Sequence, residues 1–323
     1  MRNSHCSAPV SSTRLRLGFI GVDCLVMAPL RHTDRHGGCL LIGANRKWVA
    51  DLPPGSPGDW LLVAGDLAEK VEDIEWTLRT LRSCYGTVVW VPGNHDLWAH
   101  PRDPVKLRGE ARYQHLVALC RDLGVITPED PYPVWKGSGG PAVIVPLFLL
   151  YDYTFRPDGT STKAEALDLA YRTGIIGTDE RHLHPDPYPS REAWCQARID
   201  ATLLRLAALD PELPTILVSH FPLTREPTRI LRYPVFAQWC GTEQTADWHR
   251  RFRARTVVYG HLHIPRTTFE DGVRFEEVSL GYPYEQDRHP ERPRQLIQIL
   301  PPGPARTLGP PPADGSVHPS PGR

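Results

Sequence analysis

The chain lacks any excess of charge. Its 37 Lys and Arg residues are balanced by 37 Asp and Glu residues, which gives a formal net charge of zero at pH 7. A chain without net charge has no global electrostatic attraction to nucleic acids or to anionic membranes. The balance therefore predicts no nucleic-acid surface and no membrane partner.

A long hydrophobic run is also absent. A transmembrane helix needs about 18 or more consecutive apolar residues, and the chain has no such stretch. Residues 17–30, preceded by Arg14 and Arg16, weakly resemble a signal peptide. However, Asp23 interrupts the apolar stretch and no small-residue cleavage site follows it. We therefore expect a cytoplasmic protein.

The chain has no recognisable cysteine framework. Its seven Cys residues are an odd number, they have no regular spacing, and none forms a C-x-x-C pair. Free thiols in a reducing cytosol are the simplest interpretation. Structural zinc sites favour thiolate ligands, so we expect no such site here.

The two ends of the chain have few residues that could form a core. Residues 1–16 are polar, and residues 301–323 are rich in proline, so both are expected to be disordered tails. We expect one domain over residues 17–300. Within it, residues 101–189 carry no ligand motif, and they form either a cap that covers the substrate or a helical insertion without substrate contact.

Between the tails, helical and strand patterns alternate. Apolar residues recur at helical spacing over residues 69–81 and again over residues 190–209. Further strands are predicted at residues 142–150, 274–278 and 295–300. This order predicts an α/β fold.

Four apolar, strand-like runs each end at polar residues that can bind metals. These pairs of run and motif are residues 60–64 with Gly65-Asp66, residues 87–91 with Gly93-Asn94-His95-Asp96, residues 215–218 with Ser219-His220, and residues 256–259 with Gly260-His261-Leu262-His263. In an open α/β sheet, sites gather outside the carboxyl ends of the strands. The four motifs therefore predict one shared site.

The ligand types indicate which metals this site would bind. Imidazole suits Zn, Fe, Mn or Ni, whereas carboxylate and amide oxygens suit harder ions. A mixed set of His, Asp and Asn fits two adjacent divalent ions better than a structural zinc. Two such ions can clamp the attacking and leaving oxygens of a displacement at phosphorus.

In this series of motifs the chain resembles the calcineurin-like metallophosphoesterases. The resemblance runs from Trp60 to Tyr282 and implies a four-layer α/β/β/α sandwich of the metallo-dependent phosphatase type, with two divalent metal ions. It implies the following roles: Asp66 bridges both metals; Asn94, His220 and His261 bind the second; His263 helps to bind the first; His95 contacts the phosphoryl oxygen or protonates the leaving group; and Asp96 orients His95.

The family begins with a further Asp-x-His motif, which this chain does not present cleanly. We favour Asp34 and His36 as the ligands of the first metal. A second register ends a better strand at Asp23 but has Leu25 in place of His, and a third has Cys39 and Leu41 in place of both ligands. Two further alternatives are an incomplete first metal site and a stretch before Gly43 that is not the natural coding frame.

Arginines follow the His220 motif and are candidates for binding the substrate. Arg225 and Arg229, with Arg232 beyond them, could bind phosphate oxygens bidentately, or they could belong to a solvated loop. Trp98 is a candidate for stacking on a base, or it packs inside the protein. The expected partner is a phosphate-ester small molecule or a nucleotide.

The function predicted from these residues is hydrolysis of phosphate monoesters or diesters by a metal-bound hydroxide, with His95 assisting. The alternative is a non-catalytic binding protein with an incomplete first metal site. The presence of His95 and Asp96 argues against that alternative, and the absence of an H-x-H-x-D-H pattern argues against a lactamase-type zinc enzyme.

Overall fold

The computed structural model of the chain describes residues 15–17, 25–27, 41–56, 58–281 and 296–307. Asp34 and His36, the favoured ligands of the first metal, lie outside these residues, as do Asp23 and Cys39 from the other registers. The third register continues into helix α1 (Leu41–Ala50), so Leu41 begins a helix.

The first sheet has four strands in the order β12 (Ile297–Leu300), β1 (Leu15–Leu17), β3 (Trp60–Val63) and β4 (Thr87–Trp90). Strands β1, β3 and β4 run parallel, and β12 is antiparallel to β1. The strand expected to end at Asp23 falls on residues of which 18–23 lie outside the described ranges, and β1 lies directly beside β3. The carboxyl ends of β3 and β4 therefore meet at one edge of this sheet.

The second sheet has six strands. Its order is β10 (Arg266–Glu270), β11 (Val273–Glu277), β9 (Ala254–Tyr259), β8 (Thr215–Val218), β6 (Ala142–Pro146) and β5 (Val134–Trp135). The four inner strands are parallel, and the outer two are antiparallel to their neighbours. The carboxyl ends of β8 and β9 therefore lie at the same edge of this sheet.

Alternating side chains on the strands separate two apolar layers. Leu62 of β3 and the following Ala64 pack between the two sheets with Ile216 and Val218 of β8. Leu61 points the other way, into the core beneath the helices. This period of two is what a strand buried on both faces requires.

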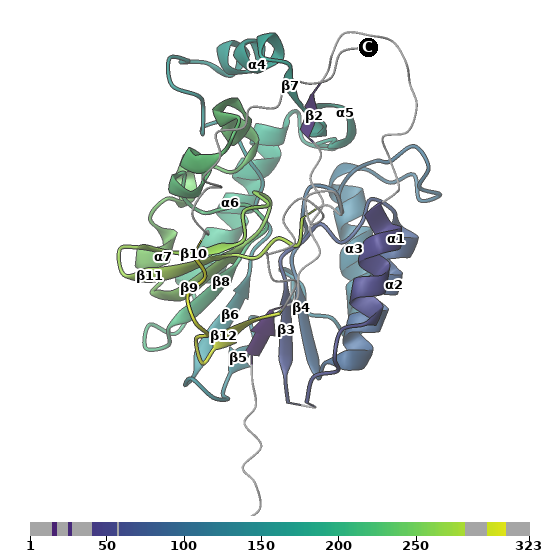
Figure 1. Ribbon diagram of the computed structural model, residues 1–323, viewed down its shortest axis with the longest axis vertical. Coiled ribbons are helices and arrows are strands. Elements are labelled where there is room, and N and C mark those ends of the chain that lie inside the picture. The colour runs from purple at the N-terminus through teal and green to yellow at the C-terminus, as the bar shows by residue number, and fades with distance from the viewer. Residues whose placement is uncertain (1–14, 18–24, 28–40, 57, 282–295, 308–323) are drawn as a thin grey trace, which may run out of the picture.

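Helices cover the outer faces of the two sheets. Figure 1 shows α1, α2 (Val71–Cys84) and α3 (Gly109–Asp122) gathered on one side, and α6 (Arg191–Ala207) and α7 (Trp248–Arg251) on the other. The arrangement confirms the four-layer α/β/β/α sandwich. None of the helices in the described ranges is long and apolar enough to cross a membrane.

The two helices predicted from apolar spacing are present with slightly different ends. The helix expected over residues 69–81 begins at Val71, where Glu72 and Asp73 suit the positive end of the helix dipole. The helix expected over residues 190–209 begins after Ser190, whose side chain caps it by accepting the backbone N–H of Ala193 at 3.2 Å.

A third group of elements lies beyond one end of the sheets. It contains α4 (Lys163–Arg172), β7 (Ile175–Gly177) paired with β2 (Leu25–Met27), and α5 (Asp179–His182), all near the top of Figure 1. Three 3-10 helices follow β8, at Glu226–Ile230, Pro234–Trp239 and Glu243–Thr245. Residues 101–189 thus supply α3, strands β5 and β6 of the second sheet, and α4, β7 and α5 of the outlying group.

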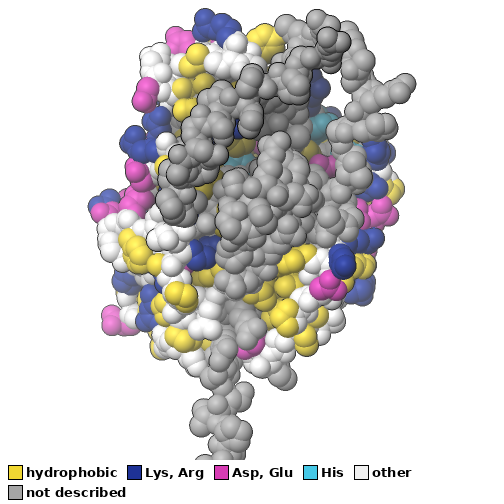
Figure 2. Space-filling view, in the orientation of Figure 1, with side chains coloured by type: hydrophobic (Ala, Val, Ile, Leu, Met, Phe, Trp, Pro, Cys, Tyr) yellow, Lys and Arg dark blue, Asp and Glu magenta, His cyan; other side chains and the backbone are white. Residues whose placement is uncertain are grey.

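The surface carries both signs of charge. On the face seen in Figure 2, basic and acidic side chains of the described residues are interspersed. This distribution agrees with the balanced composition of the chain.

Candidate metal centre

The polar residues predicted at the strand ends are buried together. Asp66 follows β3, Asn94 follows β4, His220 follows β8 and His261 follows β9. Each of these residues is at most 2% exposed. Parallel strands of both sheets end at this edge, which is why motifs far apart in the sequence meet there.

Nitrogen and oxygen atoms converge on the Nε2 atom of His220. The Oδ1 atom of Asn94 lies 2.9 Å from it, the Nδ1 atom of His261 lies 3.2 Å from it, and the Oδ2 atom of Asp66 also lies 3.2 Å from it. One ligand atom from each of Asp66, His220 and His261 falls within a 4.8 Å group. Ligands about 2.1 Å from one ion are separated by roughly 3.0–3.4 Å, so this spacing fits a bound cation.

Hydrogen bonds outside the cluster determine which atoms point into it. The Nδ1 atom of His220 lies 2.9 Å from the carbonyl oxygen of Ala64, which can only accept. Nδ1 therefore carries the proton, and in the neutral ring Nε2 presents a lone pair to the cluster. A partner of this kind is what a metal-binding histidine requires.

Asn94 is oriented in a similar way by Asp179 of α5. The Nδ2–H of Asn94 donates to Oδ1 of Asp179 at 2.9 Å, and the Nε1–H of Trp98 donates to the same oxygen at 2.6 Å. With its nitrogen held by Asp179, Asn94 presents its oxygen to His220. The sequence motifs gave no indication of this role for Asp179.

The cluster therefore places lone pairs against one another. The Nε2 atom of His220 faces the oxygen of Asn94 and the buried Oδ2 atom of Asp66, which receives no hydrogen bond. Such atoms repel unless a proton or a cation lies between them. The donor set combines imidazole, amide and carboxylate, which suits a divalent transition ion. The residues present thus fit a divalent metal ion.

Three residues of the strand-end motifs have unusual backbone conformations. Asp66, His261 and His263 have φ values of 55°, 71° and 55°, in the left-handed region that non-glycine residues rarely adopt. Such strained residues gather at functional sites. Gly93 allows a close approach, because a Cβ there would lie 1.9 Å from Oδ1 of Asp66.

Asp96 stabilises the loop that carries Asp66. Its carboxylate accepts the backbone N–H groups of Leu67 at 2.8 Å, Asp66 at 2.9 Å and Gly93 at 3.0 Å. Burial, followed by the nearby charge of Asp66, raises the pKa of Asp96 to about 6. These bonds join the loops after β3 and β4.

The carboxylate that faces His95 belongs to Glu69, in the place that the sequence analysis assigned to Asp96. Oε1 of Glu69 lies 3.5 Å from Nδ1 of His95, and Oε2 lies 3.4 Å from Nε2 of His100. Burial alone would raise the pKa of Glu69, but the neighbouring His95 holds it below its usual value. The His95 ring also stacks on Trp98, with centroids 3.7 Å apart, so Trp98 packs against an imidazole.

His263 is not a member of the group that Asp66, His220 and His261 form within 4.8 Å. It is 9% exposed and lies close enough to the buried Glu277 for its charge to act on that carboxyl. The partners that the resemblance gives it, Asp34 and His36, are outside the described residues.

The two candidate phosphate-binding arginines make surface contacts. Arg225 donates to the carbonyl oxygen of Arg156 and lies 3.4 Å from Asp158. Arg229 forms an exposed ion pair with Glu226 at 2.6 Å. These contacts are typical of a solvated loop, which was the alternative interpretation of the arginines.

The fold and the buried cluster together define a class of protein, and comparison with known sequences agrees. Residues 34–265 match the sequence profile described as calcineurin-like phosphoesterase, and the chain belongs to this family. Members of this family generally use divalent metals, as the donor set suggests. The chain is a phosphoric ester hydrolase, which sets aside the alternative of a non-catalytic binding protein.

Two findings give a particular relative. The chain is 54% identical over 270 residues to the [acyl-carrier-protein] phosphodiesterase PptH of Mycobacterium tuberculosis, covering 83% of this chain and 82% of the relative. It is also similar to the crystal structure of the phosphopantetheinyl hydrolase PptH from Mycobacterium tuberculosis. That match has a TM-score of 0.82 and 49% identity, and it covers 90% of this chain and 97% of the other.

Proposed function

We propose that the chain hydrolyses the phosphodiester that links a 4′-phosphopantetheine arm to an acyl carrier protein. The observation that carries this proposal is the 54% identity with PptH over most of both chains. The proposal is more specific than the prediction from the sequence, which left monoesterase and diesterase open. It also makes the substrate protein-linked, where the sequence predicted a small molecule or a nucleotide. The buried donor cluster at the strand ends supports the same chemistry.

In this proposal Asp66, Asn94, His220 and His261 hold one divalent ion. Asp34, His36 and His263 hold a second, with Asp66 shared between the two. When bound, the ions lower the pKa of a water and offset the negative charge that develops on the phosphoryl oxygens. Manganese is the first ion to supply, because the donor set mixes nitrogen and oxygen.

His95 is the proposed acid–base group. The carboxylate of Glu69 lies 3.5 Å from its Nδ1 atom and Trp98 stacks on its ring, so both neighbours favour one orientation of the imidazole. The Nε2 atom is therefore assigned to the phosphoryl oxygen or to the leaving oxygen. General acid catalysis of this kind contributes about 10²–10⁴-fold.

The direct test uses an acyl carrier protein that carries its arm. After incubation with the purified chain and manganese, mass spectrometry reports loss of the arm from the carrier. We expect release by the wild type and loss of release in Asp66→Asn and His220→Gln. His115→Gln, at an exposed position on α3, is the matched control. Hydrolysis of a generic diester without release of the arm would contradict the proposed substrate.

A second test concerns the number of metals. Elemental analysis of the wild type and of the double variant Asp34→Ala/His36→Ala gives the metal content per chain. We expect two ions in the wild type and about one in the variant, because the first site would lose two ligands. Equal content in both proteins would exclude Asp34 and His36 as ligands.

A further inference from the structure

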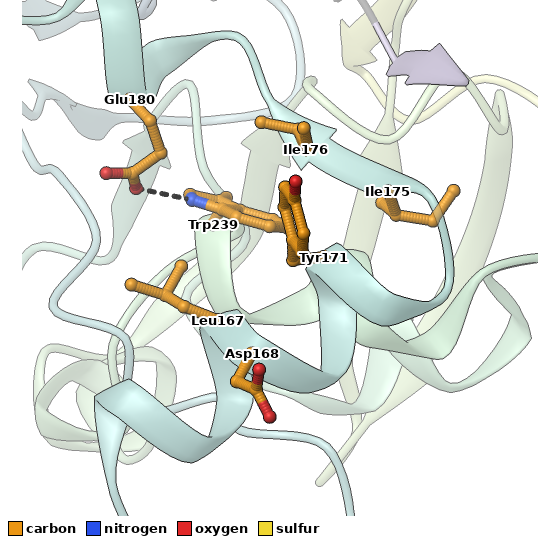
Figure 3. Close-up of a pocket in the computed structure, with 7 residues that line it drawn as sticks. All are labelled: Leu167, Asp168, Tyr171, Ile175, Ile176, Glu180 and Trp239. Carbon is orange, nitrogen blue, oxygen red and sulfur yellow. Dashed lines mark hydrogen bonds between the residues drawn. The ribbon is translucent and has the colours of Figure 1, made fainter. Parts of the chain in front are cut away.

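A cavity of about 330 Å³ lies in the outlying group of elements. Helix α4, strand β7 with the start of α5, and the 3-10 helix Pro234–Trp239 surround it (Figure 3). Its lining residues are Leu167, Asp168, Tyr171, Ile175, Ile176, Glu180 and Trp239. Small-molecule sites begin at about 300 Å³, so the cavity is large enough for part of a ligand.

The cavity shares a wall with the metal centre. Trp239 lines both this cavity and a smaller pocket that is also lined by Asn94 and His261. Residues of the segment from Ile175 to Glu180 also line both spaces. Gly177 and Asp179 face the smaller pocket, whereas Ile175, Ile176 and Glu180 face the cavity. The cavity therefore lies directly beside the metal centre, with Trp239 between them.

The position of the shared wall is fixed by its neighbours. The Nε1–H of Trp239 donates to Oε1 of Glu180 at 2.9 Å, as Figure 3 shows. Gly177 lies flat against the indole, because a Cβ there would come within 2.7 Å of the ring. Glu180 is held in turn by Arg191 at 3.0 Å and by the hydroxyl of Tyr153 at 2.6 Å. The wall is thus formed before any ligand binds.

The side chains that line the cavity indicate what kind of ligand it would bind. Leu167, Ile175 and Ile176 are aliphatic, and Tyr171 and Trp239 add two aromatic rings. The two charged lining residues, Asp168 and Glu180, are paired with Arg172 at 2.9 Å and with Arg191 at 3.0 Å, and none of the lining residues is basic, so the lining offers no cation to a phosphate group. Asp168 lies at the exposed rim in an ion pair with Arg172, and its second carboxylate oxygen can accept a hydrogen bond from an amide N–H.

We propose that this cavity binds the pantetheine arm of the substrate while the phosphodiester lies at the metal centre. The arm is an uncharged chain with two geminal methyl groups and two amides, so it matches aliphatic walls and an acidic rim. This assignment rests on the proposed function. It assigns Leu167, Tyr171 and Trp239 to substrate selection, a role in which they touch the arm and no reacting atom.

The test compares a variant that fills the cavity with a matched surface variant. Leu167→Trp places a larger side chain in the cavity, and Leu204→Trp makes the same change at a position on α6 that is 77% exposed. Thermal unfolding of both variants checks that they fold. Two readouts are used. The first is the ratio of kcat/KM for the arm-bearing carrier protein to that for bis(p-nitrophenyl) phosphate, which has no arm. The second is the Kd of pantetheine itself, measured by calorimetry.

We expect the wild type to bind pantetheine. Leu167→Trp should lower the kcat/KM ratio and raise the Kd, each by about tenfold, the scale of a steric change in an apolar pocket. Leu204→Trp should change neither. Failure of the wild type to bind pantetheine, or a Kd that Leu167→Trp leaves unchanged, would overturn the assignment.

The two readouts keep this proposal separate from the proposed function. If the wild type released the arm and Leu167→Trp left the ratio of kcat/KM values unchanged, the cavity would be rejected as the binding site and the proposed function would stand. A second outcome would have the opposite meaning. If the wild type did not release the arm but bound pantetheine, and Leu167→Trp weakened that binding, the proposed substrate would be rejected and the cavity would remain a pantetheine site.

Discussion

Oδ1 of Asp179 accepts the side-chain amide of Asn94 at 2.9 Å, although the two residues are 85 positions apart in the chain. Asp179 is 4% exposed, and it lies on α5, outside both sheets. The same oxygen accepts the indole N–H of Trp98. A residue of the outlying elements therefore orients a proposed metal ligand that the sheet alone does not fix.

Removal of Asp179 should weaken metal binding. In Asp179→Ala the nitrogen of Asn94 loses its acceptor, so its oxygen is no longer held toward His220. Losing such a partner of a metal ligand typically costs about 10–100-fold in metal affinity or activity. The manganese concentration for half-maximal activity should rise by about that factor, and Asp179→Asn, which keeps an acceptor oxygen, should recover part of it.

The matched control is Asp200→Ala, at an exposed position on α6. It should leave the manganese requirement unchanged. An unchanged requirement in Asp179→Ala would show that Asn94 needs no such partner.

Glu69→Gln should have a different effect, lowering kcat without changing the manganese requirement. The carboxylate of Glu69 lies against Nδ1 of His95 and touches none of the proposed metal ligands among its described ion pairs. A fall in kcat of about 10²-fold is expected, the lower end of the contribution from general acid catalysis. Steady-state kinetics at several manganese concentrations measure both quantities.

Glu72→Gln is the control for this variant, because Glu72 follows closely on the same segment and its side chain is 62% exposed. It should behave as the wild type. If Glu69→Gln raised the manganese requirement instead of lowering kcat, Glu69 would belong to metal binding and the proposed role would be abandoned.

The sequence predicted that the candidate ligands lie together, because they follow the simplest rule of an α/β sheet. Each lies just after an apolar run, and parallel strands bring their carboxyl ends together. Glu69 could have been found by the same rule, since it lies three residues after Asp66 on the same loop. Asp179 could not, because it belongs to a four-residue helix with no pattern that links it to Asn94.

The roles of Asp96 and of residues 142–150 show how local patterns mislead. Asp96 adjoins His95 in the sequence, but its carboxylate accepts the backbone N–H groups of the loop that carries Asp66. The apolar run at residues 142–150 forms a strand only as far as Pro146. Beyond it, Phe148 and Leu150 remain buried without strand pairing, because burial alone also favours apolar residues in a packed loop.

Metal removal should destabilise the folded chain as well as inactivate it. Without a cation, the lone pairs of His220, Asn94 and Asp66 face one another in a buried site. A ligand present at about 100 times its Kd stabilises the folded state by about 2.7 kcal/mol. A chelator should therefore lower the Tm of the wild type, and added manganese should restore it. Differential scanning calorimetry measures the change.

His220→Gln provides the comparison for this experiment. Its Tm should respond less to the chelator, because one ligand of the cluster is already lost. A Tm that the chelator shifts equally in both proteins would mean that the stabilising metal binds elsewhere.

Glu129 should make the stability of the fold depend on acidity. Burial alone would raise its pKa, but the charge of Arg198 and the hydrogen bond from the hydroxyl of Tyr113 hold the pKa below 4.5. A carboxyl whose pKa is lower in the folded state stabilises that state above the unfolded pKa. The stabilisation is then lost as the pH falls below 4.5 and through the folded pKa.

Glu129→Gln should therefore lower the free energy of unfolding near neutral pH by about 1–2 kcal/mol, a value reduced by partial solvent screening. Urea unfolding of both proteins should show this difference shrinking below pH 4.5. Both proteins share the residues of the candidate metal centre, so any effect of acid on that centre is the same in both and cancels in the difference between their free energies of unfolding. Glu75→Gln, in the exposed pair with Arg79, should change stability by no more than about 0.5 kcal/mol. A difference that stayed constant in acid would mean that Glu129 acts through packing alone, because only a carboxylate that becomes protonated can lose its attraction to Arg198.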